Sequence, residues 1–264
     1  MARGSGRSGL AARPPIQVVD RLARILSLFA AGQTEVSIAQ IGAELGLSRP
    51  SVHRYIRSLV DIGLLEPSFA PGSYRPGPLL VQLASQALGS LEVVERAGPY
   101  MRRLAEEAEE TVVLSLWGGH GPVVVRVQPC PFKLVQIVVR TGAPLPLNSS
   151  QGLVFLAYLP DGALVQRLLA QFPPDVRAEI EGQIEEVRRQ GLAISSRVIE
   201  GIRAIAVPVF DEQGTIAATM AFVGTTTALP ESPDSSYARL LLATAQELSE
   251  QLGYRATSKR TQGR

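Results

Sequence analysis

The sequence predicts an α+β protein of two domains, in which a small helical head with a β-hairpin precedes a larger domain of antiparallel strands and helices. Three short helical patterns and one hairpin pattern fill residues 16–77. A helix that is apolar on two sides follows at residues 79–91. Strand and helix patterns then alternate over residues 92–253, as is typical of an α+β fold.

The head is divided by residues that begin or end helices. Its first helix carries a broad apolar stripe that starts at Val18 and Val19. Ser48 is an expected N-cap for the third helix, and Pro50 falls in the first turn, where proline is tolerated. The remaining boundaries are marked by Gly32, Ser37, Gly46 and Gly63. These signals predict helices near residues 16–31, 38–45 and 49–62.

A hairpin completes the head. Short strands are expected at residues 64–66 and 73–76, around a turn that contains Pro67, Pro71 and Gly72. Three short helices followed by a hairpin in roughly 60 residues is the layout of a winged helix-turn-helix. The head is therefore assigned to residues 16–77, after a flexible tail at residues 1–15.

The helix at residues 78–91 has two apolar stripes, which indicates two neighbours. One stripe holds Leu80, Ala84 and Leu88, and the other holds Leu83, Ala87 and Leu91. One neighbour is the helix's own domain, and the other is either more of the same chain or a second subunit. We expect this helix to link the domains and to support a homodimer.

The larger domain is expected to span residues 92–253, with a basic tail at 254–264. Its first helix, at 92–110, begins or bends at Pro99. Strands are expected at 111–117, 122–127, 134–139, 192–194, 202–210 and 215–223. Further helices are expected at 151–159, 174–190 and 237–252.

Composition narrows the function classes. No run of about 18 apolar residues occurs, so no membrane span is expected, and the N-terminus lacks the apolar core of a signal peptide. A single cysteine, Cys130, fits a reducing cytoplasm, and with only two histidines neither a zinc site nor another metal or cofactor is expected. Residues 1–76 hold nine arginines and five acidic residues, whereas residues 77–252 carry a net charge of −6. A basic head on an acidic body is the charge layout of a DNA-binding module.

The third helix of the head carries the chemistry of DNA recognition. Its apolar residues predict an inward face, which leaves arginines and hydroxyls outside. Arg49 and Arg54 are expected to read guanine in the major groove, and His53 and Arg57 to contact the backbone. Ser48 and Ser51 lie at the helix N-terminus, where a phosphate is held, and Arg75 is on the wing. The partner is therefore predicted to be double-stranded operator DNA.

Two other functional classes fit the sequence less well. An enzyme needs a nucleophile with a base, a metal or paired carboxylates in a cavity, and no such pattern occurs; we expect no catalysis. The acidic run Glu106, Glu107, Glu109 and Glu110 is interpreted as solvated helix surface. A purely architectural DNA binder would not need so large a second domain.

The motifs also resemble a known family. Six segments, in order over about residues 16–253, resemble the IclR family of bacterial regulators. They are VVDRLARILSLFA, VSIAQIGAELGLSRPSVHRYIRSLVDIGLLE, YRPGPLLVQLA, AGPYMRRLAEEAEETVVLS, RTGAPLPLNSSQGLVFLAYLP and EEVRRQGLAISSRVIEGIRAIAVPVFDEQGTIAATMAFVG. The resemblance implies a winged head, a linker helix and a GAF-like effector domain in a dimer or dimer of dimers. It implies a transcription regulator controlled by a small molecule, with a repressor favoured and an activator of a catabolic operon responding to a small organic acid as the alternative.

The resemblance also implies where the effector binds. The family's ligand-lining segments correspond here to residues 148–153, 195–196, 201–204 and 220–223, which gives the candidates Ser149, Ser150, Gln151, Gly152, Ser195, Ser196, Ala204, Ala221 and Val223. Several positions where the family often has a cysteine, an acidic residue, a lysine or small hydroxyls are here apolar or uncharged. Because a buried carboxylate needs buried donors, an apolar or aromatic effector is favoured over a small, highly charged acid. Trp117 is expected either to contact the ligand or to fill the core.

Overall fold

The computed structural model describes residues 16–30, 33–89, 91–133 and 137–255. The chain divides into two compact units, Met1–Gln82 and Leu83–Arg264. The predicted tails at residues 1–15 and 254–264 lie outside the described residues, apart from Tyr254 and Arg255. None of the described helices is long and apolar enough to cross a membrane.

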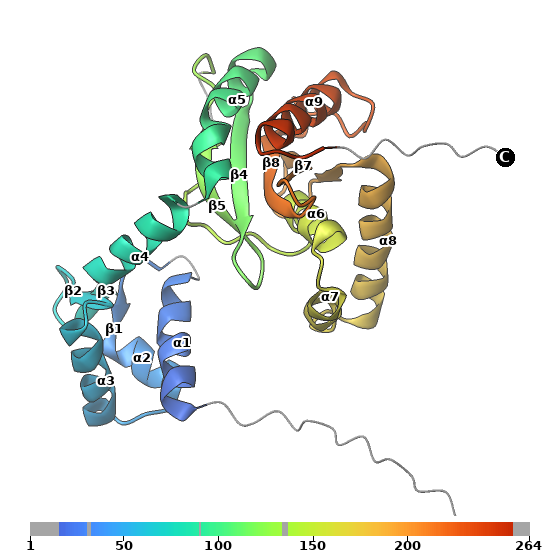
Figure 1. The fold of residues 1–264 in the computed structure, drawn as a ribbon. Coiled ribbons are helices and arrows are strands. Elements are labelled where there is room, and N and C mark those ends of the chain that lie inside the picture. Colours follow the sequence, from blue (N-terminus) through green and yellow to red (C-terminus); the bar gives the residue numbers. More distant parts are fainter. Residues whose placement is uncertain (1–15, 31–32, 90, 134–136, 256–264) are drawn as a thin grey trace, which may run out of the picture. The chain divides into compact units, whose positions relative to one another are not determined.

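The first unit is a three-helix head with a small sheet (Figure 1). Its helices are α1 (Gln17–Ala30), α2 (Ile38–Leu45) and α3 (Arg49–Asp61). The hairpin β2 (Leu65–Pro67) and β3 (Ser73–Pro76) is joined by a two-residue strand, β1 (Val36–Ser37), in the order β1-β3-β2. The sequence pattern gave no sign of β1, because two residues are too few to show an alternation. The head's core is built from Ile25, Val36, Ile41, Val52, Ile56 and Leu65.

Capping residues set the turn between α2 and α3. The Ser37 hydroxyl accepts a hydrogen bond from the Gln40 backbone N–H, and the Gln40 Oε1 accepts one from the Ser37 backbone N–H. Gly46 ends α2 with φ 63°, a left-handed conformation that glycine adopts without a steric penalty. The chain therefore turns sharply into α3, as a helix-turn-helix requires.

The start of α1 differs from the expected apolar stripe. Ile25 is fully buried, but Val18 and Val19 are 60% and 58% exposed. These two residues lie in the first turn of the helix, beyond the reach of the head's core. The stripe is therefore buried by this chain only over the later turns of α1.

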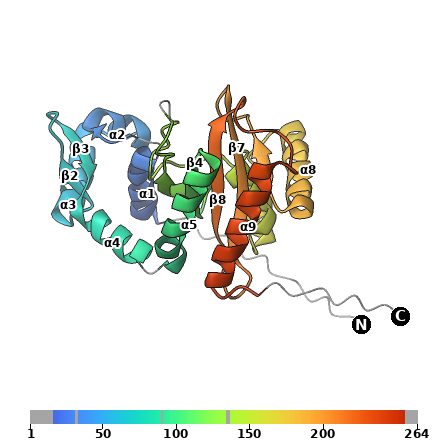
Figure 2. The same ribbon diagram turned by 90° about the horizontal axis from the view of Figure 1, so that it is seen from above.

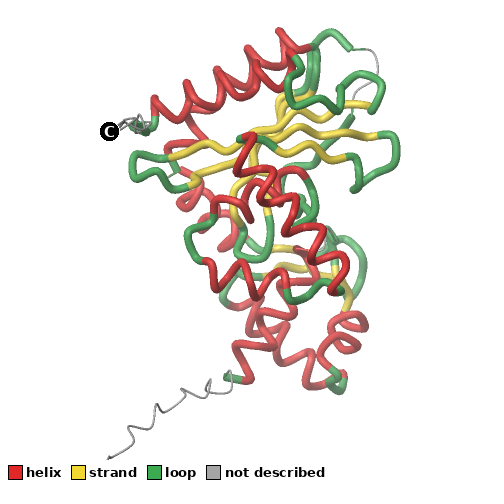
Figure 3. The backbone as a smooth tube through the Cα atoms, turned by 90° about the vertical axis from the view of Figure 1, so that its right-hand side faces the viewer, coloured by secondary structure: helices red, strands yellow, loops and turns green. Residues whose placement is uncertain are grey.

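The second unit is an antiparallel sheet of five strands in the order β5-β4-β8-β7-β6. The strands are β4 (Thr111–Trp117), β5 (Pro122–Gln128), β6 (Ala193–Ser195), β7 (Ile202–Phe210) and β8 (Ile216–Thr225). In Figure 3 they form a continuous band between helices. The expected strand at 134–139 is not formed at residues 137–139, and residues 134–136 lie outside the described part.

Helices cover both faces of this sheet. On one face lie α5 (Glu92–Ala108, with Pro99 inside it) and α9 (Ser236–Gln251), side by side in Figure 2. On the other lie α6 (Ser150–Tyr158) and α8 (Pro174–Gln190). A short helix that the sequence analysis missed, α7 (Gly162–Leu169), follows α6 and is capped by the Asp161 side chain.

The linker helix, α4 (Pro78–Gly89), crosses the boundary between the two units. Its residues from Val81 to Ala87 are exposed, with Val81 at 65% and Leu83 at 54%. Leu80 is half-buried, and the side chain of Leu88 lies outside the described residues. The chain thus leaves apolar side chains of α4 in contact with water.

Candidate functional site

The recognition helix α3 separates an apolar inner face from a basic outer face. Val52, Ile56 and Leu59 are buried in the head's core. Arg54 is two residues from both Val52 and Ile56, so at about 100° per residue it points roughly 160° away from each. Arg54 therefore projects away from the core of the head.

The other predicted DNA-contacting residues of α3 are also accessible. Arg49, His53 and Arg57 are exposed. By the same geometry Arg57 lies beside Arg54, while Arg49 and His53 lie along one flank. α3 thus presents three guanidinium groups and an imidazole on one continuous surface, the donor types that read base edges and phosphates.

The N-terminus of α3 differs in detail from the predicted cap. Ser48 is the N-cap by its backbone angles, but its side chain makes no capping hydrogen bond. Its Oγ lies 3.2 Å from the Ser51 Oγ instead. Pro50 has no N–H, and the N–H groups of Ser51 and Val52 donate to the Ser48 carbonyl. An anion here would therefore meet mainly the two hydroxyls and Arg49 rather than a row of free N–H groups.

The wing residue Arg75 is already engaged. Its Nε donates to Glu66 Oε1 at 2.7 Å, and its guanidinium lies 5.6 Å from the centre of the Phe69 ring. Phe69 is 92% exposed in the turn between β2 and β3. Phe69 was not predicted as a DNA contact, although an aromatic residue in a Pro/Gly turn is unusual. A phosphate would compete with Glu66 for Arg75.

One further contact fixes α3. Arg21 of α1 donates to the Tyr55 hydroxyl of α3 at 2.9 Å and lies 5.8 Å from the centre of that ring. The pair ties the first helix to the side of the recognition helix. No local pattern distinguishes Arg21 from Arg24, which also interrupts the apolar stripe of α1.

A cavity of about 300 Å³ lies in the second unit, beside the start of α6. It is lined by six of the residues expected at the effector site: Ser149, Ser150, Gln151, Ser195, Ala204 and Val223. The cavity also has an apolar wall formed by Val113, Val139, Leu145, Val198, Ile199 and Ile202. Of these, only Ile202 lies in a segment that was expected to line the effector site, and the others were missed. Arg140, also missed, is part of the lining. Residues from three separate chain segments meet only in the folded sheet, so no local pattern shows this wall.

Three expected effector residues are not among those that line the cavity. Gly152 packs against the preceding turn, where a Cβ would come within 2.4 Å of the Leu147 carbonyl oxygen. Ala221 is fully buried in the cluster between the sheet and α6. Ser196 is half-buried in the loop after β6. Gly152 therefore shapes the start of α6 through its backbone.

Strand β8 alternates as a pleated strand must. Met220 and Phe222 pack toward α5 and α9, whereas Ala221 belongs to the opposite face and Val223 lines the cavity. Trp117 lies on that same face, with its ring centre 5.4 Å from that of Phe155, and is part of the packing around α6. It is not among the residues that line the cavity.

The polar end of the cavity is formed at α6. The Ser149 hydroxyl donates to the Pro146 carbonyl and accepts from the Gly152 N–H, so it caps the helix. Gln151 is 3% exposed, and its Oε1 accepts from the Thr219 hydroxyl at 2.8 Å. The Gln151 amide nitrogen has no hydrogen-bond partner among the described residues.

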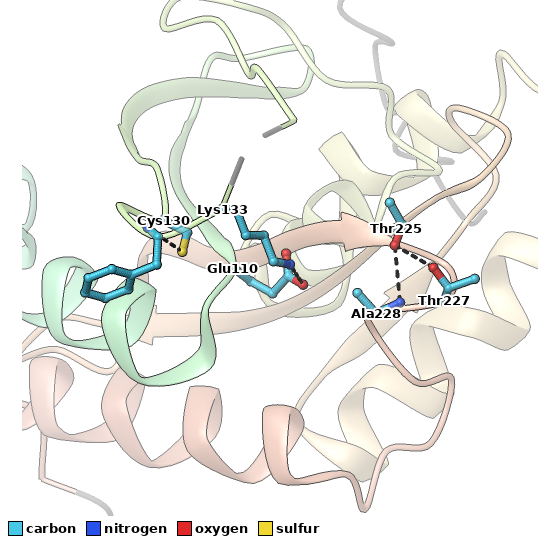
Figure 4. Close-up of polar contacts among 7 residues, drawn as sticks. Glu110, Cys130, Lys133, Thr225, Thr227 and Ala228 are labelled. Atoms are coloured by element: carbon cyan, nitrogen blue, oxygen red, sulfur yellow. Dashed lines mark hydrogen bonds and ion pairs between the residues drawn. The ribbon is translucent and has the colours of Figure 1, made fainter. Parts of the chain in front are cut away.

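An ion pair with a buried carboxylate holds the segment that follows β5 (Figure 4). The Glu110 side chain is 4% exposed and pairs with the Lys133 ammonium group. The interpretation of Glu110 as a solvated charge was therefore wrong, because the chain enters the sheet one residue later and takes this carboxylate inside. In the same view the Phe132 N–H donates to the Cys130 sulfur, and the Thr225 hydroxyl accepts from the Ala228 N–H.

The loop between β6 and β7 is tied to α8. Arg197 forms an ion pair with Glu179. The hydrogen bond from the Arg197 guanidinium holds the pKa of the Glu179 carboxyl below its ordinary value. The adjacent residues Val198 and Ile199 line the cavity. The ion pair thus restrains one part of the cavity wall.

Family models cover both units. A model described as the IclR helix-turn-helix domain matches residues 18–68, and one described as the bacterial transcriptional regulator IclR C-terminal matches residues 85–250. The regulator XynR of Escherichia coli (strain K12) is 28% identical over 253 residues, which are 92% of this chain and 100% of XynR. The repressor AllR of Salmonella typhimurium (strain LT2) is 25% identical, over 95% of this chain and 96% of AllR.

Solved structures share the fold. A putative IclR regulator from Silicibacter sp. superposes with a TM-score of 0.79 at 24% identity, over 90% of this chain and 97% of that one. An IclR homolog from Microbacterium hydrocarbonoxydans, complexed with 4-hydroxybenzoate, gives a TM-score of 0.71 at 22% identity, over 89% and 98%. The relatives are regulators rather than enzymes. This chain belongs to the IclR family and is a DNA-binding transcriptional regulator.

Proposed function

We propose that this regulator is a repressor whose α3 enters the major groove of its operator and whose DNA binding is controlled by a small molecule in the cavity of the second unit. The observation that carries the first half is the orientation of Arg54, opposite the buried residues Val52 and Ile56. Arg54 and Arg49 read bases, and His53 and Arg57 contact the backbone.

The remaining contacts position the head on the duplex. Ser48 and Ser51 hold a phosphate at the start of α3, and Arg75 exchanges Glu66 for a backbone phosphate or the minor groove. Phe69 at the wing tip lies next to Arg75 and reaches the same groove. Contacts of this kind fix the register of the protein but carry little sequence information.

The effector half rests on the cavity. It is mostly apolar, with hydroxyl and amide groups at one end, which is the usual composition of a small-molecule site. A structural relative is complexed with 4-hydroxybenzoate, and a sequence relative is named a repressor. The first relative supports a small, largely apolar effector, and the second supports a repressor.

Control requires two arrangements of the protein that bind DNA differently. We propose a homodimer, alone or as a dimer of dimers, held in part by Leu80, Leu83, Ala84 and Leu88 of α4. The effector binds one arrangement more tightly and shifts the population toward it, by no more than its differential affinity. The spacing of the two heads, and with it operator affinity, then changes.

The first experiment is a thermal-shift screen of the full chain against aromatic acids, neutral aromatics and small keto acids. Each hit is added to the protein bound to a duplex selected from random sequence, and binding is followed by fluorescence anisotropy. We expect a hit to raise the dissociation constant for DNA. Ligands that bind without altering DNA affinity would contradict effector control, and failure to select any duplex would contradict the operator assignment.

A further inference from the structure

The tip of the wing, residues 68–72, exposes one aromatic ring to water. Phe69 is 92% exposed and is the single large apolar side chain of this turn. We propose that Phe69 is an apolar wedge that enters the minor groove of the operator, inserts between two stacked bases and makes affinity depend on how easily that base step unstacks. This inference rests on the proposed position of the head on DNA and adds a specificity-determining residue to it.

The turn beside Phe69 has a defined backbone conformation. The Ser73 N–H donates to the Ala70 carbonyl at 3.0 Å. Pro71 and Gly72 lie between these two residues, and Gly72 has φ 73°. Proline followed by a residue of positive φ is the pattern of a type II turn. Because the turn is already ordered, inserting the ring costs less conformational entropy than it would from a loose loop.

The other side of Phe69 is anchored as well. The Ser68 N–H donates to the Ser73 carbonyl at 2.9 Å, which closes the hairpin. The Ser68 hydroxyl donates to the carboxylate of Glu35, which precedes β1. Phe69 is therefore flanked by Ser68 and Ala70, both of which are hydrogen-bonded.

The surroundings of the ring suit DNA better than a protein partner. The Arg75 guanidinium lies 5.6 Å from the ring centre and is paired with Glu66. The negative potential of the minor groove attracts arginine, so Arg75 follows Phe69 into the groove once it leaves Glu66. A docking site for a protein normally presents a contiguous apolar patch, whereas residues 68–72 hold no second large apolar side chain.

The layout of the head places the wing at the minor groove. β2 begins at Leu65, shortly after α3 ends at Asp61, and both belong to the same unit. The major and minor grooves are neighbours along the duplex. With α3 in the major groove, the wing meets the adjacent minor groove at base pairs that α3 does not contact.

Insertion of the ring gives these base pairs a role in recognition. Apolar wedges partly unstack a base step and bend the duplex toward the major groove. Pyrimidine–purine steps unstack and kink most easily. The operator should therefore favour such a step beside each sequence that α3 reads, although no hydrogen bond distinguishes it.

The test compares the full-length parent protein with Phe69→Ala and Phe69→Leu. Each protein selects duplexes from random sequence, and 2-aminopurine is then placed at the favoured step of the parent's duplex. We expect binding of the parent to raise the 2-aminopurine fluorescence, because that base unstacks. Phe69→Ala should abolish this rise, bind the parent's duplex about tenfold more weakly and select no preferred step at that position. Phe69→Leu keeps an apolar wedge and should retain most of the effect.

Two comparisons isolate the wedge. Phe132→Ala removes a phenylalanine of the second unit that is 71% exposed, and it should behave like the parent. Phe69→Ala removes no charge, so it should keep the parent's slope of log affinity against log salt, whereas Arg75→Gln should lower that slope by about one.

Two results would overturn the inference while the proposed function stands. One is a Phe69→Ala variant with the affinity and step preference of the parent. The other is a loss of affinity that is the same on every duplex, with no difference in fluorescence. A parent protein that selects no duplex would instead contradict the proposed function, and the inference with it.

Discussion

Replacing Arg54 by alanine tests the orientation of α3 most sharply. The residue projects away from the core between the buried Val52 and Ile56, and its guanidinium has no ion pair or side-chain hydrogen bond with the described residues of the head. Alanine has the highest helix propensity, so α3 should remain folded. The change therefore removes a DNA contact while leaving the protein intact.

The magnitude follows from the kind of contact. A guanidinium that binds a guanine edge through two hydrogen bonds contributes about 1–3 kcal/mol of discrimination, which is roughly 5-fold to 150-fold in the dissociation constant. A phosphate contact instead weakens all sequences alike and lowers the slope of log affinity against log salt by about one. The two roles therefore give different results in one assay.

The assay is fluorescence anisotropy with the selected duplex and with duplexes altered at single positions, each at several salt concentrations. We expect Arg54→Ala to lose affinity and to become indifferent to one base pair. Arg102→Ala, on the second unit, is the control and should change neither quantity. Unchanged operator affinity would remove Arg54 from the reading set, and a uniform loss with a lower salt slope would assign it to the backbone.

Three further predictions concern assembly and stability. Leu83→Glu places a charge on an apolar, 54% exposed position of α4 and should shift a micromolar sample from dimer toward monomer in sedimentation; a parent protein that is already monomeric would refute the dimer. Glu110→Gln removes the buried carboxylate that pairs with Lys133 and should lower the free energy of unfolding by roughly 2–3 kcal/mol, less than for a fully buried pair. The exposed Glu107→Gln should have little effect in the same denaturant titration. The hydrogen bond from Arg197 lowers the pKa of Glu179, so the ionised carboxylate stabilises the fold at neutral pH. This contribution is lost as the pH falls from about 4.3, the ordinary pKa of glutamate, through the lower pKa of the folded state. The melting temperature of Glu179→Gln should therefore fall less on acidification than that of the parent protein, and an identical pH dependence would contradict the link.

The head follows from its sequence because its signals are local. Gly46, Ser37 and Ser48 stand at helix ends, and the spacing of Val52, Ile56 and Leu59 alone fixes the inner face of α3. Where the prediction failed, the determinant was not local. The exposure of Val18 and Val19 depends on how far the core of the head extends along α1, which the periodicity of the stripe does not reveal.

The second unit shows the same division. The alternation of residues 220–223 predicts that half of them face the cavity, but only the pairing of β8 with β4 and β7 decides which half. Glu110 ends an acidic run that has the composition of solvated helix surface, and its partner Lys133 is 23 positions away. Arg140 likewise becomes a candidate only when its segment is placed against α6 and the loop after β6.

The central claim is that the cavity and the recognition helix are energetically coupled, and linkage gives its most direct test. The dissociation constant for the selected duplex is measured with and without the effector found in the screen, and that of the effector with and without saturating duplex. Coupling requires both constants to change by the same factor, about 5-fold to 150-fold for a typical allosteric protein. The predicted result is that the effector and the duplex each raise the other's dissociation constant, and by the same factor. An effector that binds in the cavity and leaves the affinity for DNA unchanged would contradict the account.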